Sequence, residues 1–171
     1  MKFSDGWLNE AKKVISPNFN GRPVNSEVNL LVIHNISLPP DQFESSYIEL
    51  FFQNKLPYED HPYFEHLKGL EVSAHFLIKR DGQIIQFVSC NDRAWHAGAS
   101  EFCGEKNCND FSIGIELEGT DVRPYSNAQY QSLTKVTSCI QKAYPSITKN
   151  RITGHEHIAP NRKTDPGESF D

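Results

Sequence analysis

The segment Val28–Ile33 constrains the fold more than any other part of the chain. It is an almost continuous apolar run in which only Asn29 is polar. Such a run is typical of a strand that is buried on both faces of a sheet. The run ends at His34 and Asn35, where the chain turns polar, so these two side chains are expected at the end of a buried strand.

Two further segments have the composition of strands. Residues 74–79 and 83–88 flank Asp81-Gly82, and this dipeptide predicts a hairpin with a type I′ turn. Residues 111–117 alternate, so that one face of the expected strand carries large apolar residues and the other carries a polar row. The apolar positions are Ile113, Ile115 and Leu117, and the opposite positions are Ser112, Gly114 and Glu116.

Two helices are expected. Residues 42–54 carry aromatic and aliphatic residues at roughly helical spacing, and Pro57 stops the segment. Ser126 is a good N-cap for a helix that runs to Tyr144 before Pro145. Its apolar stripe consists of Tyr130, Leu133, Val136, Ile140 and Tyr144. Residues 154–171 are rich in proline, glycine and charge and are expected to form an ordered loop.

These elements predict an α/β fold in which a central mixed β-sheet is packed against helices. The chain has 171 residues without an internal repeat or linker, which favours a single domain over residues 1–171. The net charge of −5 argues against nucleic acid as the main partner, because phosphate binding needs a basic surface. Nothing in the chain suggests an assembly element, so a monomer is expected.

The N-terminus and the cysteines indicate a cytoplasmic protein. The opening residues lack the apolar core of a secretory signal, and no apolar run is long enough to cross a bilayer, so no membrane partner is expected. The four cysteines contain no Cys-x-x-Cys pair, and we expect free thiols in a reducing compartment.

Four of the seven histidines lie where a coil meets an expected strand, namely His34, His75, His96 and His155. A catalytic zinc ion usually takes three protein ligands from histidines and carboxylates. His34 and His155 are placed to face a common site, and Asp165 would supply the carboxylate. The chain has no compact zinc signature, however, and buried hydrogen-bonded histidines and a turn aspartate remain the alternative reading of these residues.

Glu116 is unusual because glutamate is disfavoured in the middle of an apolar strand. The small residues on its face suggest the floor of a groove, where a carboxylate beside a metal would act as a general base. A glutamate that faces water on an edge strand is the alternative. Lys163 lies two residues before Asp165 and would stabilise an oxyanion near the metal, or it is a solvated loop lysine.

Aromatic residues offer walls for a sugar site. Trp95 and His96 follow the expected hairpin, and Tyr63 follows Pro62. Aromatic faces stack on the apolar faces of sugars, although core or loop packing explains these residues equally well.

Several long strings together resemble one family, the type-2 N-acetylmuramoyl-L-alanine amidases and peptidoglycan recognition proteins. The strings are LLVIHNISLPP, VSAHFLI, RAWHAG, CNDFSIGIELEGTD, TGHEHIAP and RKTDPG. Within the family the likeness is to the cytoplasmic amidases that act on 1,6-anhydro-N-acetylmuramyl-L-alanine in peptidoglycan recycling. It extends from Gly6 to Asp171.

The resemblance implies one Zn²⁺ ion held by His34, His155 and Asp165, with Glu116 and Lys163 as the catalytic pair. It implies hydrolysis of the amide bond between (1,6-anhydro-)N-acetylmuramic acid and L-alanine in soluble muropeptides. We expect substrate contacts from Asn35, Tyr63, Trp95, His96 and Arg162.

Two other functions stay open within the same fold. One is a lytic amidase that acts on intact cell wall, and the other is a non-catalytic peptidoglycan-binding module. Binding modules typically lack one of the zinc ligands, whereas all three are present here. Glu71 and Asn107 stand where the family carries basic residues, so the resemblance does not extend to the contacts with the stem peptide.

Overall fold

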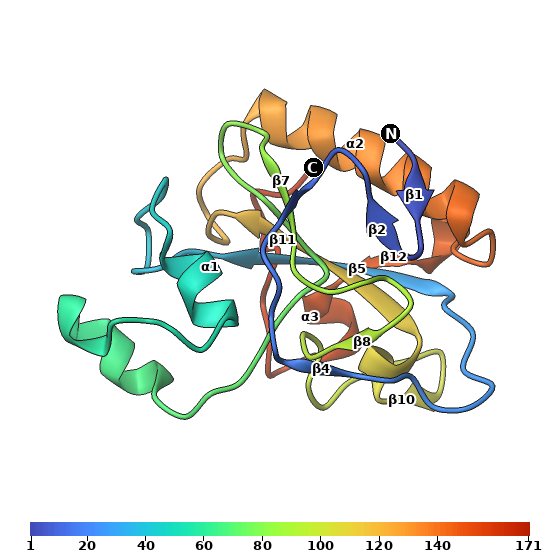
Figure 1. The fold of residues 1–171 in the computed structure, drawn as a ribbon, viewed down its shortest axis with the longest axis horizontal. Helices are drawn as coiled ribbons and strands as arrows, with labels where there is room; N and C mark the ends of the chain where they lie inside the picture. Colours follow the sequence, from blue (N-terminus) through green and yellow to red (C-terminus); the bar gives the residue numbers. More distant parts are fainter.

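A six-stranded mixed sheet runs through the centre of the protein (Figure 1). The computed structural model describes residues 1–171. The strand order is β12-β5-β11-β6-β7-β3, and all neighbouring strands are parallel except β6 and β7. The strands span Ile152–Gly154 (β12), Leu30–Ile36 (β5), Ser112–Glu118 (β11), Phe76–Ile78 (β6), Ile84–Gln86 (β7) and Lys12–Lys13 (β3). The predicted mixed α/β sheet is therefore confirmed.

Smaller elements complete the fold. Three two-stranded ribbons pair β1 with β2, β4 with β8 and β9 with β10. They span Phe3–Ser4 (β1), Trp7–Leu8 (β2), Phe19–Asn20 (β4), Arg93–Ala94 (β8), Glu101–Phe102 (β9) and Glu105–Lys106 (β10). The α-helices are Tyr47–Phe52 (α1), Asn127–Ala143 (α2) and His155–Ile158 (α3), and the 3₁₀ helices are Tyr58–Asp60, Pro62–Leu67, Cys108–Asp110 and Lys149–Arg151.

The two faces of the sheet are covered differently. The long helix α2 covers one face, and α1, α3 and the connecting segments lie on the other (Figure 1). In β5 the side chains of Leu31 and Ile33 join the core under α2, whereas Leu30 and Val32 join a second core with Ile158 of α3. The strand is thus buried on both faces, as its apolar run predicts.

Helix α2 begins and ends close to the predicted positions. The Ser126 hydroxyl accepts a hydrogen bond from the Gln129 N–H, and the Gln129 side chain accepts one from the Ser126 N–H, which completes a capping box. The helix ends at Ala143, just before Tyr144. In the predicted stripe Leu133, Val136 and Ile140 are buried, and the two tyrosines are partly buried at its margins.

Helix α1 is shorter than predicted, because contacts with distant strands hold the residues before it. The Glu44 N–H donates to the Glu118 carboxylate, and the Lys79 ammonium donates to the Ser45 carbonyl. Glu44 also has a positive φ of 65°, which is incompatible with a helix. The helix therefore covers Tyr47–Phe52 instead of residues 42–54.

The predicted turn type of the hairpin is wrong, although β6 and β7 form the predicted antiparallel pair. A type I′ turn needs positive φ at both central residues, and only Gly82 of the Asp81-Gly82 pair has one, at 86°. The Gly82 N–H donates to the Lys79 carbonyl, and the Lys79 N–H donates to the Gln83 carbonyl. The connection is thus a three-residue loop with glycine in the left-handed position.

The C-terminal segment is more regular than predicted. Gly154 is the last residue of β12, and His155–Ile158 form the short helix α3. Residues 159–171 form the expected ordered loop. Proline, glycine and charged residues are frequent in this region and mask the short helix and the end of β12. The pairing partner of β12, the strand β5, is more than a hundred residues away.

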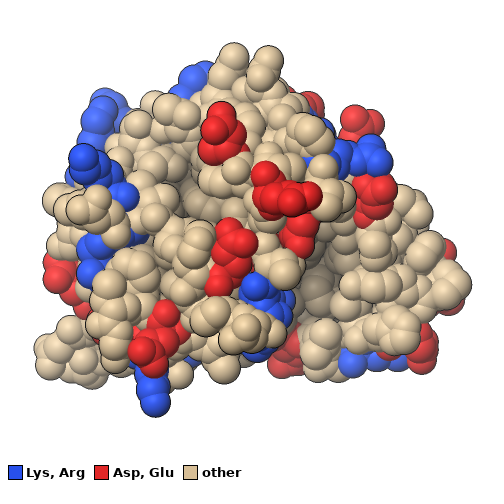
Figure 2. All heavy atoms as spheres, turned by 180° about the vertical axis from the view of Figure 1, so that it is seen from behind, with Lys and Arg blue, Asp and Glu red and all other residues tan.

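All four cysteines are free in the structure. None of the helices combines the length and the apolar character that a membrane crossing requires. On the face shown in Figure 2, acidic and basic side chains are interspersed, and the basic ones do not form a continuous stripe.

Candidate active site

His34 and Glu116 lie side by side on the face of the sheet that α2 leaves uncovered. The parallel strands β5 and β11 pair with Glu116 directly opposite His34 in register. Side chains alternate along a strand, so both residues point away from the core under α2, which contains Ile33 and Ile115. His34 is 1% exposed and Glu116 is 9% exposed.

His155 and Asp165 reach the same place from the C-terminal part of the chain. Gly154 pairs with Ile33 at the end of β12, so the next residue, His155, enters the site at the first position of α3. Asp165 is brought back over α3, because its carbonyl accepts a hydrogen bond of 2.9 Å from the Glu156 N–H.

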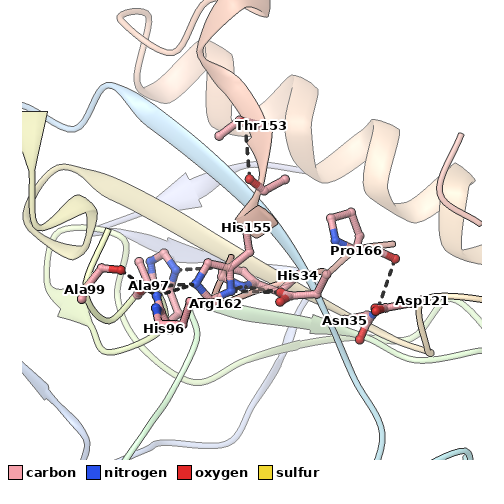
Figure 3. A network of polar contacts seen from close by, with 12 residues as sticks. His34, Asn35, His96, Ala97, Ala99, Asp121, Thr153, His155, Arg162 and Pro166 are labelled. Carbon is pink, nitrogen blue, oxygen red and sulfur yellow. Dashed lines mark hydrogen bonds and ion pairs between the residues drawn. The ribbon is translucent and has the colours of Figure 1, made fainter. Parts of the chain in front are cut away.

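The carbonyl of Pro166 anchors the Asp165 loop to the sheet. It accepts hydrogen bonds from the Asn35 amide at 3.1 Å and from the Tyr125 hydroxyl at 2.7 Å. The Asn35 amide also donates to the Asp121 carboxylate at 2.8 Å (Figure 3). Two side chains therefore hold the residue that follows Asp165.

Three potential metal ligands converge on one point. His34 Nδ1 lies 2.9 Å from His155 Nδ1 and 3.1 Å from Asp165 Oδ2, and His155 Nδ1 lies 3.0 Å from the same oxygen. Ligands of a tetrahedral zinc ion at about 2.0–2.1 Å would stand roughly 3.3 Å apart. The spacing and the set of two imidazoles and one carboxylate both fit such an ion.

The hydrogen bonds of His155 strengthen this fit. Its Nε2 lies 3.1 Å from the Ala97 carbonyl, which can only accept, so Nε2 carries the proton and Nδ1 presents a lone pair. That lone pair faces the Asp165 carboxylate and His34 Nδ1. Acceptors this close together need a proton or a cation between them.

Burial and hydrogen bonding together set the pKa values of His34 and Asp165. Burial lowers the pKa of His34 to about 4, although a hydrogen bond that His34 donates to the Asp165 carboxylate acts in the opposite direction. Burial alone would raise the pKa of Asp165, but its hydrogen bonds to His155 and His34 outweigh this effect and hold the pKa below its usual value. The site therefore favours a neutral His34 imidazole beside an ionised Asp165 carboxylate, the protonation states that metal binding requires of these two groups.

Glu116 is a buried carboxyl group with one oxygen left unpaired. Its Oε2 has no hydrogen-bond partner. Burial and the nearby Asp165 carboxylate raise the pKa of Glu116 well above its usual value, and the Lys163 ammonium partly opposes them. Because β11 lies in the middle of the sheet, the alternative of a water-facing glutamate on an edge strand is wrong.

The cluster forms one wall of a cavity of about 260 Å³. The chemical wall contains His34, Glu116, His155, Lys163 and Asp165. Apolar side chains also line the cavity, namely Phe51, Phe52, Leu67, Leu70 and Val72. A ligand in this cavity would thus meet both an apolar surface and a polar reaction centre.

Of the residues expected to bind substrate, some line the cavity and others do not. Asn35, Trp95 and His96 line the cavity, whereas Tyr63 and Arg162 are outside its lining. Tyr63 is partly exposed on the 3₁₀ helix 62–67. The Arg162 guanidinium donates to the carbonyls of Ala97 and Ala99, both at 2.7 Å (Figure 3).

The groove that was expected above the small residues of β11 is filled in part. The ring of His96 occupies the space over Gly114, and its Nε2 lies 3.2 Å from the Ser112 hydroxyl. Only the Glu116 end of the row borders the cavity. Glu71 and Asn107 are both exposed.

Sequence reasoning missed the apolar wall of the cavity. Phe51 and Phe52 lie in the segment 42–54, for which the sequence predicted only a helix, because helical spacing of aromatic residues does not distinguish a core from a cavity wall. Tyr125, which holds Pro166, gave no signal in its sequence neighbourhood.

Comparisons with known proteins agree on one family. The family described as N-acetylmuramoyl-L-alanine amidase matches residues 24–168. The 1,6-anhydro-N-acetylmuramyl-L-alanine amidase AmpD of Haemophilus influenzae is 54% identical over 166 residues, which cover 97% of this chain and 90% of that protein.

Solved structures extend the likeness to three dimensions. A crystal structure of AmpD superposes with a TM-score of 0.97 at 53% identity and covers 100% of this chain and 95% of that one. The Escherichia coli amidase AmiD, bound to the substrate anhydro-N-acetylmuramic acid-L-Ala-D-γ-Glu-L-Lys, has a TM-score of 0.61 at 26% identity, covering 96% of this chain and 57% of that one. The chain belongs to the N-acetylmuramoyl-L-alanine amidase family.

Proposed function

We propose that the protein is a zinc-dependent amidase that cleaves the bond between 1,6-anhydro-N-acetylmuramic acid and L-alanine in soluble muropeptides during peptidoglycan recycling. The observation that carries this proposal is the convergence of His34 Nδ1, His155 Nδ1 and Asp165 Oδ2 within 3.1 Å of one another beside the buried, unpaired Oε2 of Glu116. A structural core has no need of such an arrangement, whereas metal-assisted hydrolysis requires it.

Zinc is the metal that the donor set favours. Two imidazoles and one carboxylate form a three-ligand set typical of catalytic zinc sites, which leave a fourth position open. When bound there, zinc polarises a carbonyl group and makes water a better nucleophile at neutral pH. The cluster faces the cavity, so a substrate carbonyl would have access to the open position.

Glu116 is the proposed general base and acid. Its buried carboxylate takes a proton from the attacking water as the new bond forms between the water oxygen and the lactyl carbonyl carbon. It then passes that proton to the nitrogen of L-alanine as the carbon–nitrogen bond breaks. A raised pKa suits this role, because a proton must be accepted and released near neutral pH.

Lys163 is the proposed partner for the negative charge that develops on the carbonyl oxygen. It lines the cavity with the three ligands, and its charge is felt by both Glu116 and His34. A fixed ammonium near a developing oxyanion stabilises the transition state more than the ground state.

The substrate assignment rests on the relatives, one of which is named for the 1,6-anhydro-N-acetylmuramyl-L-alanine amidase activity. The cavity supports it, since an anhydro-sugar has apolar faces that suit the wall formed by Phe51, Leu67 and Leu70. We propose that residues 1–171 act as one catalytic domain, with the free cysteines suited to the reducing cytoplasm.

The test is a cleavage assay with a soluble anhydro-muropeptide, followed by mass spectrometry, together with measurement of bound zinc. We expect release of the free peptide and the intact anhydro-sugar, loss of cleavage after chelation, and recovery when zinc is restored. Faster cleavage of intact sacculi would favour a lytic amidase. Binding of the muropeptide without zinc or cleavage would refute the proposal and indicate a recognition module.

A further inference from the structure

His96 lies directly behind the proposed metal ligand His34. Its Nδ1 is 2.9 Å from His34 Nε2, the nitrogen on the far side of the ring from the metal cluster. The two rings are nearly perpendicular, with centroids 4.9 Å apart and an interplanar angle of 85°. The second nitrogen of His96, Nε2, lies 3.2 Å from the Ser112 hydroxyl. Both nitrogens of His96 therefore have partners within the protein.

The surrounding chain holds the His96 ring in this place. The backbone N–H groups of His96 and Ala97 both donate to the Asn109 side-chain oxygen, at 3.0 and 2.7 Å. A Cβ atom on Gly114 would stand 2.6 Å from Cγ and Nδ1 of His96. Residue 114 must therefore be glycine for the ring to pack this closely against β11, a close approach of the kind that explains glycine inside a strand.

We propose that His96 is a positioning residue for the metal site and that its Nδ1 accepts a hydrogen bond from His34 Nε2–H. This inference rests on the metal site of the proposed function. A neutral imidazole carries one ring proton, and a proton on Nε2 leaves the Nδ1 lone pair free. The acceptor on His96 thus favours the form of His34 that can bind a metal and fixes the orientation of its ring.

This assignment fixes the donor and the acceptor in each hydrogen bond between His34, His96 and Ser112. Once His34 Nδ1 binds a cation, Nε2 must donate to His96 Nδ1, and His96 Nε2–H must in turn donate to the Ser112 hydroxyl. The chain starts at a ligand and ends on the central strand β11, so the sheet itself supports the ligand. Loss of such a second partner typically weakens metal binding about 10- to 100-fold.

A matched pair of variants tests whether residue 96 must accept a hydrogen bond from His34. In His96→Asn the side-chain oxygen is as many bonds from the backbone as Nδ1, so it can accept from His34. In His96→Leu a methyl group takes that position and nothing can accept. Zinc dissociation constants are measured by competition with a chromophoric chelator, and the thermal stability of each metal-free variant is measured alongside.

We expect His96→Leu to weaken zinc binding about 10- to 100-fold and His96→Asn to stay within about threefold of the wild type. The two metal-free variants should melt at similar temperatures, because the difference between them lies in the hydrogen bond. Equal zinc affinity in wild type and His96→Leu would overturn the inference. Absence of zinc binding by the wild type would instead refute the proposed function.

A second measurement needs no variant and applies even if His96→Leu does not fold. Nitrogen-15 NMR of the histidine rings in the zinc-loaded wild type reports which ring nitrogens carry protons. We expect a proton on Nε2 of His34 and none on Nδ1 of His96. A proton on His96 Nδ1 would show that it does not accept from His34, and the inference would be wrong.

Discussion

Replacing Glu116 with glutamine should abolish turnover and at the same time stabilise the metal-free protein. Glutamine has nearly the same shape but cannot take a proton from water. Positioned general bases contribute about 10²- to 10⁴-fold to rate, so we expect Glu116→Gln to lower kcat by that factor. This corresponds to about 2.7–5.4 kcal/mol in the activation barrier.

The gain in stability follows from the burial of this carboxyl group. Glu116 is 9% exposed and its Oε2 has no partner, so the ionised carboxylate carries an uncompensated desolvation cost of about 1–3 kcal/mol or more, which the neutral glutamine side chain does not have. The raised pKa of Glu116, caused first by burial and then by Asp165, means that the folded state resists ionisation. The cost is therefore absent below the unfolded pKa of about 4.3 and grows as the pH rises toward the folded pKa.

The assay compares wild type and Glu116→Gln by urea unfolding in chelator at pH 4 and pH 7, and by cleavage of an anhydro-muropeptide with zinc restored. We expect the variant to be the more stable protein at pH 7 and the two proteins to converge at pH 4. Zinc binding should be retained, because Glu116 is not among the three converging ligands. Turnover within tenfold of wild type would refute the role as general base, and a stability difference independent of pH would refute the electrostatic argument.

Three further perturbations test other parts of the structure. Ser126→Ala removes the capping box of α2 and should lower the free energy of unfolding by about 0.5–2 kcal/mol, measured with urea. Burial and the charge of Arg22 lower the pKa of His75 to about 3, so the folded state binds fewer protons than the unfolded state between pH 6.5 and 3. The metal-free protein should lose stability as the pH falls through this range, and acid titration of His75→Gln should show a slope shallower by about 1.4 kcal/mol per pH unit. Tyr125→Phe removes one of the two hydrogen bonds to the Pro166 carbonyl and should raise the zinc dissociation constant without touching a ligand, while an unchanged constant would show that the Asn35 bond suffices.

The elements that could be predicted from the sequence are those with local causes. The strand β5 follows from an apolar run, and α2 follows from a cap and a 3.6-residue period that need no distant partner. Helix α1 could not be bounded in this way, because its start depends on Glu118 and Lys79, which reach it from other strands. The hairpin was recognised from its composition, but its turn type depends on φ angles that Asp-Gly does not determine alone.

The site could be predicted in part, because some of its residues stand out within their own segment and others meet only in the fold. Glu116 stands out within its own strand, because glutamate in an apolar central strand is anomalous. His34 and Asp165 are 131 residues apart, so their spacing in the sequence carries no information on their contact. Residue type and position suggested a site of His34, His155 and Asp165 only as one of two readings, and the family resemblance then favoured it. The position of the His96 ring had one local indication in the sequence, the glycine inside β11, which indicates a close approach by another group.

Two of the proposed metal ligands, His34 and Asp165, belong to parts of the molecule that are fixed in place by different contacts. His34 belongs to the strand pair β5 and β11, whose hydrogen bonds lie in the interior of the sheet. Asp165 belongs to the C-terminal loop, in which its own carbonyl and the Pro166 carbonyl accept hydrogen bonds and Ser169 and Phe170 make further contacts. Proteins open locally where few buried contacts must be broken, long before they unfold as a whole. If a metal binds there, the carboxylate ligand would be able to leave while the histidine on the sheet stays in place, and opening of the C-terminal loop would then set the residence time of the metal.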